Sequence, residues 1–280
     1  MKTITKFFLV IASLFIIVGL GISIYVMNTY GWDFTKLNTT QYNKVIYEIN
    51  GIFNSIEIDC KTIDINIKPA NEENCRVEAY ESDKVKYDVQ IKDNKLTIKE
   101  IDERVLLDYM GINISETSLT LFVPNEKYES LDINLTTGDI ELFDLLVNNI
   151  NINLTTGDIK LFDSSFENVA VKFTTGDVEL TNIKCNDINI KGNNGDVTLN
   201  NVISLNEITI HTTTGDVELN KCDASYIKID TTTGDIDCIL LSNKNFIVNT
   251  TSGDYDIPPS SGENICELNT TTGDIYVVLG

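Results

Sequence analysis

The stretch Leu131–Leu142 reads LDINLTTGDIEL, and its pattern returns through the second half of the chain. Its Gly-Asp pair occurs eight times, at intervals of 19, 19, 19, 20, 19, 19 and 20 residues. Internal repetition at a fixed period is the signature of an architecture built from stacked units. The eight pairs are Gly138-Asp139, Gly157-Asp158, Gly176-Asp177, Gly195-Asp196, Gly215-Asp216, Gly234-Asp235, Gly253-Asp254 and Gly273-Asp274.

Each repeat has apolar residues at every second position on both sides of its turn, as in Ile188–Leu199 (INIKGNNGDVTL). This alternation is typical of strands with one buried face. A unit of about 19 residues cannot bury that face alone, whereas stacked units share a continuous core. The sequence therefore predicts an all-β fold, a parallel β-solenoid of about 19-residue coils with eight Thr-Thr-Gly-Asp-type turns over residues 131–280. Propellers and leucine-rich repeats fit this period poorly.

Residues 46–130 are predicted to form an irregular β capping region. Within it, residues 50–68 resemble a coil that lacks the glycine, and residues 76–99 alternate around Asp93-Asn94, which favours a hairpin. A polar loop over residues 101–116 follows. At the other end the chain stops a few residues after the last Gly-Asp turn, so the C-terminal coil is expected to form an open edge that a partner chain or self-association would cover.

The N-terminal segment predicts an anchor. Residues 7–27 contain no charge, and as a helix of about 31 Å they would match the roughly 30 Å hydrocarbon core of a bilayer. A cleaved signal peptide is the alternative, although no A-x-A cleavage site follows. Lys2 and Lys6 favour a cytoplasmic tail at residues 1–6, so the chain beyond a linker at residues 28–45 would be extracytoplasmic in a single-pass membrane protein.

Charge narrows the possible partners. The 280 residues contain 42 Asp and Glu against 21 Lys and Arg, which gives a net charge of −21. Because nucleic-acid recognition depends on Lys and Arg, this balance argues against binding DNA or RNA. The single histidine, His211, rules out a His-rich metal site and leaves one possible base for a Ser-His-Asp triad.

Val123-Pro124, the stretch Leu131–Ile140 and the run of Thr-Thr-Gly-Asp-Ile/Val turns resemble the bacterial putative-adhesin family of β-strand-repeat domains of unknown function. The resemblance covers about residues 45–280. It implies a β-solenoid exposed on the cell envelope behind an N-terminal membrane anchor, and it does not by itself establish adhesion.

The eight glycines are predicted to hold turn positions with positive φ, and the eight aspartates to bond backbone amides. A second hypothesis makes Asp139, Asp158, Asp177, Asp196, Asp216, Asp235, Asp254 and Asp274 a Ca²⁺ ladder, because carboxylates about 4.8 Å apart repel one another and a cation would relieve that repulsion. No other cofactor is expected.

No catalytic residues are predicted. The carboxylates repeat evenly, whereas a catalytic pair should depart from the repeat. The departures are Gly192-Asn193-Asn194, Tyr255, and Pro258-Pro259 with Ser260-Ser261-Gly262, and none of them adds an acid–base group.

The six cysteines are mostly incompatible with disulfides. The register places Cys185 and Cys222 two coils apart, and likewise Cys238 and Cys266, which is about 9.6 Å and beyond the roughly 7 Å limit for bridging. Cys60 and Cys75 remain a possible pair.

The sequence therefore predicts a non-catalytic, adhesin-like binding module of the bacterial cell envelope, whose partner is an envelope glycan or protein. The alternative is an accessory component of a membrane system that senses envelope stress. Co-purification of a membrane kinase or regulator from solubilised membranes would favour that alternative.

Overall fold

The structure is a computed structural model that describes residues 3–32, 40–70, 74–105, 108 and 117–280. It divides into two compact units, residues 1–43 with 103–116 and residues 44–102 with 117–280. Residues 33–39 of the predicted linker, and 106–107 and 109–116 of the predicted polar loop, lie outside the described residues.

The first unit contains one long apolar helix, α1 (Thr3–Thr29). Its segment Thr5–Thr29 is long and apolar enough to cross a membrane, and none of its most apolar part is buried within the protein. The hydroxyls of Ser13 and Ser23 donate to the carbonyls of Leu9 and Gly19 at 2.7 and 2.9 Å. Polar side chains that bond within the helix are compatible with hydrocarbon surroundings.

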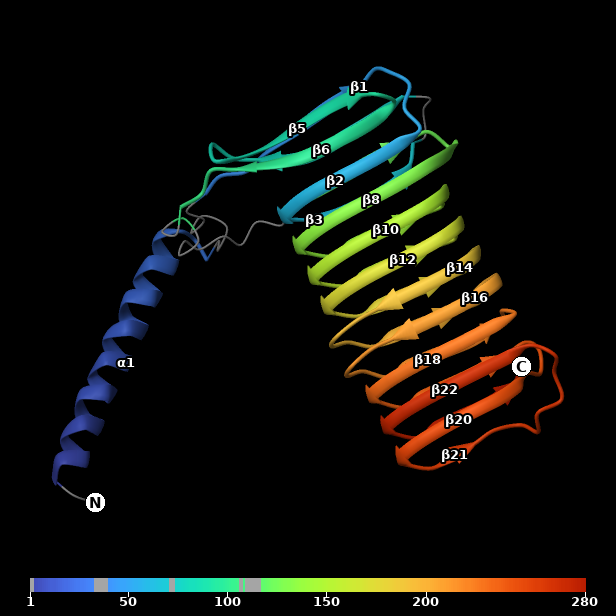
Figure 1. Ribbon diagram of the computed structural model, residues 1–280. Coiled ribbons are helices and arrows are strands. Elements are labelled where there is room, and N and C mark those ends of the chain that lie inside the picture. Colours follow the sequence, from blue (N-terminus) through green and yellow to red (C-terminus); the bar gives the residue numbers. More distant parts are fainter. Residues whose placement is uncertain (1–2, 33–39, 71–73, 106–107, 109–116) are drawn as a thin grey trace. The chain divides into compact units, whose positions relative to one another are not determined.

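The second unit consists of two sheets (Figure 1). The 12-stranded sheet contains, in spatial order, β1 (Asn43–Ile49), β4 (Cys75–Glu81), β7 (Ser118–Val123), β3 (Asp64–Pro69), β9 (Ile140–Phe143), β11 (Ile159–Phe162), β13 (Val178–Thr181), β15 (Val197–Asn200), β17 (Val217–Cys222), β19 (Ile236–Leu240), β23 (Ile275–Leu279) and β21 (Tyr255–Asp256). The 11-stranded sheet contains β20 (Asn245–Ser252), β22 (Ile265–Thr272), β18 (Tyr226–Thr233), β16 (Ile203–His211), β14 (Lys184–Lys191), β12 (Ser165–Thr175), β10 (Leu146–Thr156), β8 (Lys127–Thr137), β2 (Ser55–Thr62), β6 (Lys95–Asp102) and β5 (Val85–Lys92).

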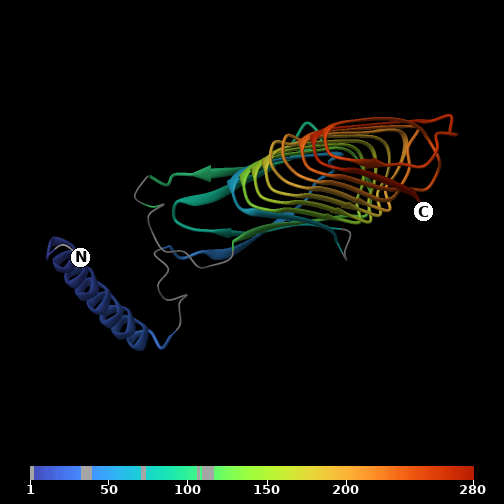
Figure 2. The same ribbon diagram turned by 90° about the horizontal axis from the view of Figure 1, so that it is seen from below.

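Each coil is one strand of the 11-stranded sheet, a Thr-Thr-Gly-Asp-type turn and one strand of the 12-stranded sheet. Successive coils pair in parallel and in register, so that Leu131, Ile150 and Val169 lie side by side. Seen along the stack, the coils are flattened rings with the two sheets face to face (Figure 2). The predicted parallel β-solenoid is confirmed.

The core lies between the two sheets and continues from coil to coil. The inward positions predicted from the alternation are buried, as at Ile152 in β10 and Leu161 in β11. Because each coil adds its aliphatic side chains to the same cluster, the apolar face that one unit cannot hide is covered by its neighbours.

The turn requires glycine for two reasons. All eight Gly-Asp glycines have φ between +132° and +153°, a region closed to residues with a Cβ. In addition, a Cβ at Gly157 would lie 2.0 Å from the carbonyl oxygen of Gly138 in the preceding coil. The positive φ and the short distance to the preceding coil therefore each require glycine at this position.

The first coil, β2 and β3, lacks this glycine, as the sequence predicted. Ile63 occupies the position, it is buried, and its φ is not positive. The strands beyond this coil, β6 and β7, belong to the N-terminal cap, so no Gly-Asp turn lies beneath Ile63. The close approach of two stacked Gly-Asp turns, which requires glycine at Gly157, is therefore missing at Ile63.

The N-terminal end of the solenoid is covered by antiparallel strands. β5 and β6 form the predicted hairpin, and its turn residues Asp93 and Asn94 have φ of 52° and 62°. This conformation matches the twist of a two-residue hairpin. On the other sheet β4 runs antiparallel to β7. The change of direction ends the parallel stack.

The C-terminal end departs from the predicted order. β22 lies between β18 and β20, and β23 lies between β19 and β21, so the last coil in sequence is not the last coil in space. The prediction that the C-terminal coil forms the open edge is therefore wrong, because the coil of β20 and β21 is outermost. Pro258-Pro259 explains this, since prolines cannot donate to a sheet ladder and confine the short strand β21 to an edge.

Glycine at position 192 is explained by side-chain packing. The corner position that it occupies is Leu135, Leu154 and Phe173 in the three coils before it. A Cβ at Gly192 would lie 2.0 Å from the ring of Phe173. The large ring in one coil is thus accommodated by the missing side chain in the next.

Candidate functional site

The turn aspartates form one hydrogen-bonded column. In each coil Oδ1 of the aspartate accepts the backbone N–H of the aspartate in the next coil, at 2.7 to 2.9 Å. In spatial order the column is Asp64, Asp139, Asp158, Asp177, Asp196, Asp216, Asp235, Asp274 and Asp254. Each side chain except that of Asp254, the last in space, therefore ties two coils together.

Asp64 belongs to this column, although it was not predicted from the sequence to do so. It follows Ile63 in place of glycine, and its carboxylate accepts the N–H of Asp139 at 2.9 Å. The signal was the match of Thr62–Ile65 (TIDI) to the TGDI of the later turns.

The bonds in the column outweigh its repulsion. Neighbouring unit charges about 4.8 Å apart repel by roughly 0.9 kcal/mol in water, whereas a hydrogen bond to a charged group contributes about 1.5–3 kcal/mol. The carboxylates are thus stable without a cation. Among the described residues no group of three or more His, Cys, Asp or Glu is arranged to hold a metal ion. Ca²⁺ binding by this column stays a prediction.

Beside the Asp column an open hollow of about 360 Å³ lies on the 12-stranded sheet. Asp158, Asp177, Asp196 and Glu179 line it together with Lys160. The carboxylates here are the repeated groups of the fold, spaced by the coil, so this hollow contains no pair that differs from its neighbours.

The outer face of the 11-stranded sheet has amide ladders. Asn153 donates through Nδ2 to Oδ1 of Asn134 at 2.9 Å, and Asn151 donates to Asp132 at 2.8 Å. Beyond Asn153 the same register position is occupied by Lys172, Lys191 and His211 in consecutive coils. This row is named the cationic column below.

A shallow hollow of about 370 Å³ adjoins the cationic column. Asp59, Asn134, Asn153 and Lys172 line it, together with the exposed hydroxyls of Thr136, Thr155 and Thr174. Its polar groups come from four neighbouring coils and offer both donors and acceptors.

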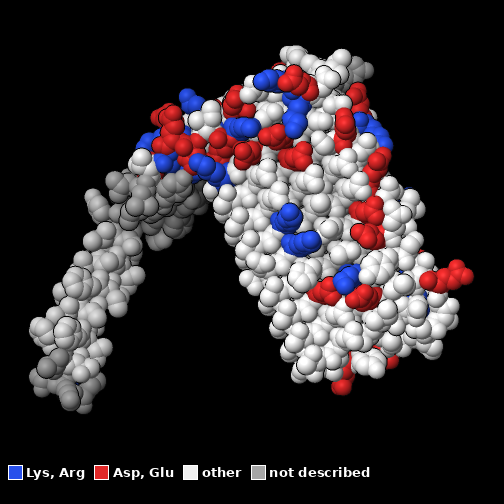
Figure 3. Space-filling view, viewed as in Figure 1, with Lys and Arg blue, Asp and Glu red and all other residues white. Residues whose placement is uncertain are grey.

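Charge is distributed unevenly on this face. Figure 3 shows a broad neutral field over the middle strands with a small group of basic side chains within it and acidic side chains along one edge. The outward residues in the later half of strands β10, β12, β14 and β16 are Asn151, Asn153, Ala170, Lys172, Asn189, Lys191, Thr209 and His211, and these eight include no acid. Nearer the middle of β14 and β16, the half-buried Asp187 and Glu207 face outward.

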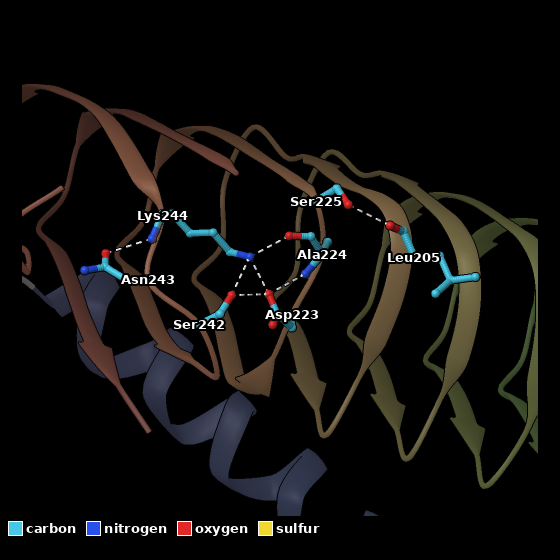
Figure 4. A network of polar contacts seen from close by, with 7 residues as sticks. All are labelled: Leu205, Asp223, Ala224, Ser225, Ser242, Asn243 and Lys244. Carbon is cyan, nitrogen blue, oxygen red and sulfur yellow. Dashed lines mark hydrogen bonds and ion pairs between the residues drawn. The ribbon is translucent and has the colours of Figure 1, made fainter. Parts of the chain in front are cut away.

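Near the C-terminal end a lysine is buried completely (Figure 4). Lys244 precedes β20, and its ammonium forms an ion pair with Asp223 and donates to the carbonyl of Ala224 at 2.6 Å and to Oγ of Ser242 at 2.9 Å. Ser242 also donates to Asp223, at 2.9 Å. The network connects the turn before β18 to the turn before β20. It therefore spans the level that β22 occupies between these two strands.

Lys244 therefore has a structural explanation. Residues 241–244 carry the chain across two coil levels, whereas residues 163–164 carry it across one. The anchored ammonium fixes this longer step. The burial of Lys244 was not predicted from the sequence, because one lysine in a polar turn has no pattern that indicates burial.

All six cysteines are buried free thiols. Cys60 lies beside Leu135 near the end of β8, whereas Cys75 lines a hollow with Tyr128 near the start of that strand, so the two do not form the pair considered from the sequence. Burial raises the thiol pKa to about 12 in Cys75 and Cys185, which leaves these thiols protonated and unreactive.

The exchange of the last two coils brings Cys238 and Cys266 closer than the sequence predicted. Cys238 in β19 and Cys266 in β22 belong to adjacent coils, not to coils two apart as predicted, because β22 and β23 stack directly on β18 and β19. Burial raises the pKa of both, for Cys266 to about 12. Both act as small apolar groups of the core.

Comparison with known proteins identifies the family and the fold. The family model Toastrack DUF4097 matches residues 53–277. A putative lipid binding protein from Parabacteroides distasonis is 11% identical, with a TM-score of 0.56, over 84% of this chain and 97% of that one. A putative adhesin from Bacteroides fragilis is 16% identical, with a TM-score of 0.50, over 85% and 97%. No curated protein matches this chain.

Proposed function

The chain belongs to the Toastrack DUF4097 family, and we propose that it is a membrane-anchored, non-catalytic binding module of the bacterial cell envelope. In this proposal α1 is the anchor and the solenoid is extracytoplasmic. One solved structure of the same fold is named an adhesin and another a lipid binding protein, both with "putative" in the name. These names agree with a binding role, although similarity at this identity concerns only the fold.

The observation that carries the proposal is the pairing of the repeated polar groups with one another. The Asp column bonds backbone amides, and the amide ladders bond their own neighbours. Acid–base catalysis needs two groups whose environments separate their pKa values. An evenly repeated column gives each carboxylate the same surroundings, which suits a long binding surface better than a reaction centre.

The test of the binding role is sedimentation of the full chain, in detergent, with isolated cell-wall sacculi that retain their attached polymers. We expect the protein to pellet with the sacculi and the wall polymers to keep their length after overnight incubation. Shortened polymers would refute the non-catalytic role, and protein that stays in the supernatant would refute the binding role.

The test of the anchor uses a tag at the N-terminus. An uncleaved anchor keeps the tag on the mature protein and leaves it in the membrane fraction after washing with high salt. Protease added to intact cells should then digest residues 44–280. Loss of the tag would instead indicate a cleaved signal peptide, and protection from protease would indicate the opposite orientation.

A further inference from the structure

The cationic column departs from the repeat, and we infer that it binds a carboxylated polysaccharide lying along the solenoid axis. This inference rests on the proposed function and names its ligand class. Lys172 and Lys191 are exposed and occupy the same register position in adjacent coils. His211 occupies that position in the next coil.

The two lysines lack partners within the protein. Among the described residues, neither Lys172 nor Lys191 forms an ion pair or a side-chain hydrogen bond. Like charges directly opposite each other on neighbouring strands destabilise a sheet. In a chain with twice as many acids as bases, two unpaired neighbouring lysines are therefore an uncompensated feature that an anion would relieve.

Two acids lie in the same register row as the cationic column, Asp230 beyond His211 and Asp59 beyond Asn134. Asp230 accepts from Asn269 at 2.8 Å and lies 3.7 Å from Lys228. Two acids of the neighbouring row are paired with lysines. Glu57 on β2 accepts from Lys95 and Lys99, at 3.1 and 3.4 Å, and these bonds lower its pKa. Glu267 on β22 accepts from Lys228 at 2.9 Å, which lowers its pKa as well. Asn153 and His211 separate Asp59 and Asp230 from Lys172 and Lys191, so no acid lies next to either lysine in this row.

The direction of the column fits a polymer. The register positions follow one another along the stack at about 4.8 Å, so a chain lying along the axis meets one such position in every coil. The hollow beside Lys172 adds the amides of Asn134 and Asn153 and three threonine hydroxyls. Sugar hydroxyls can donate to and accept from these groups, while the carboxylates contact the lysines.

Other classes of ligand fit the cationic column less well. Protein partners are held mainly by buried aromatic and apolar anchors. Among the eight outward residues around the cationic column, the one apolar side chain is that of the half-buried Ala170. A lipid acyl chain also needs an apolar groove. A nucleic acid is held largely by aromatic side chains that stack on its bases, and no Phe, Tyr or Trp is among the eight outward residues around the column.

The test measures binding of fluorescently labelled polygalacturonate to the full chain in detergent micelles. Its carboxyl-reduced form, which has the same backbone without charge, is the matched ligand. The test variant is Lys172→Gln with Lys191→Gln. The control variant is Lys86→Gln with Lys160→Gln, which removes the same charge from an exposed position in the cap and from the other sheet.

We expect wild-type protein and the control variant to bind the carboxylated polymer equally, and the test variant to bind roughly tenfold more weakly. Binding should also weaken as salt is raised. Equal binding of the reduced polymer, equal binding by the test variant, or no binding of polygalacturonate would each overturn the inference. The proposed function is judged separately, since sacculus binding that persists in the test variant would leave it intact.

Discussion

The regular coils from β8 to β19 and the exchanged coils from β20 to β23 are built from the same repeat but are held in order differently. In the regular coils the turn after each strand of the 12-stranded sheet steps to the next level, and the Asp column follows the sequence. In the exchanged coils the chain skips a level and returns through residues 257–264. The repeat therefore specifies how coils pair, and the departures from it specify which coil lies next to which.

The largest expected effect comes from the turn of a regular coil. Gly176→Ala would place a Cβ 1.8 Å from the carbonyl oxygen of Gly157, at φ of +132°. We expect a loss of about 4 kcal/mol in the free energy of unfolding, because strain and steric overlap add. Urea unfolding followed by circular dichroism measures it. Asn193→Ala in the next turn should cost less than about 1 kcal/mol, and equal losses would contradict the argument.

A second prediction concerns the buried lysine that fixes the skipped level. Lys244→Ala leaves Asp223 and Ser242 without the ammonium, and we expect a loss of about 3 kcal/mol. Hydrogen exchange should show protection lost in β20–β23 and kept in β10–β14. Lys184→Ala, at an exposed lysine, is the control. Uniform loss of protection would mean that Lys244 does not specify the coil order.

The Asp column predicts a smaller contrast between an interior and a terminal position. Asp177 accepts the N–H of Asp196, whereas Asp254 is the last in space and accepts no N–H from a further coil. Asp177→Ala should therefore cost about 2 kcal/mol and Asp254→Ala less than about 0.5 kcal/mol. Thermal unfolding of both variants measures the difference. If they lose the same stability, the hydrogen bonds of the Asp column do not hold neighbouring coils together.

The Ca²⁺ hypothesis is tested on the same column. If the carboxylates bind the cation, the melting midpoint of the full chain rises between chelator and millimolar Ca²⁺, because a ligand of the folded state stabilises it. Asp177→Ala should then reduce this rise. An unchanged midpoint in the wild type would exclude the Ca²⁺ ladder.

The smallest effect is a pH dependence in the exchanged coils. Bonds from Lys228, Asn269 and Tyr226 lower the pKa of Glu267 in the folded state. Its contribution is therefore present above the unfolded pKa, near 4.3, and is lost as the pH falls through the lower folded value. Glu267→Gln should reduce the stability difference between pH 7 and pH 3 by less than about 1 kcal/mol, because the pair is partly exposed.

The control for this prediction is Glu218→Gln, at an exposed glutamate of β17 with no ion pair among the described residues. It should leave the stability difference between the two pH values as it is in the wild type. A change as large as that of Glu267→Gln would mean that the measured dependence comes from the overall charge of the protein and not from the Glu267 bonds.

The sequence determined the coil, the register and the buried face, because a period of about 19 residues, alternation and glycine turns are local features with a direct physical reading. It also predicted the first coil without glycine and the β5–β6 hairpin. Within the candidate site it located the Asp column, except for Asp64, where glycine was missing and the motif was harder to see.

Only the tertiary structure decided the order of the last two coils, the burial of Lys244 and the cationic column. Every coil has the same inward pattern, so the sequence pairs any coil with any other equally well, and the choice depends on contacts between distant turns. Pro258-Pro259, shortly after β21, was the one local signal, because residues without an N–H are tolerated in a sheet mainly at its edge. Likewise Lys172 and Lys191 become neighbours only when the coils stack, since 19 residues of chain separate two side chains that the sheet brings together.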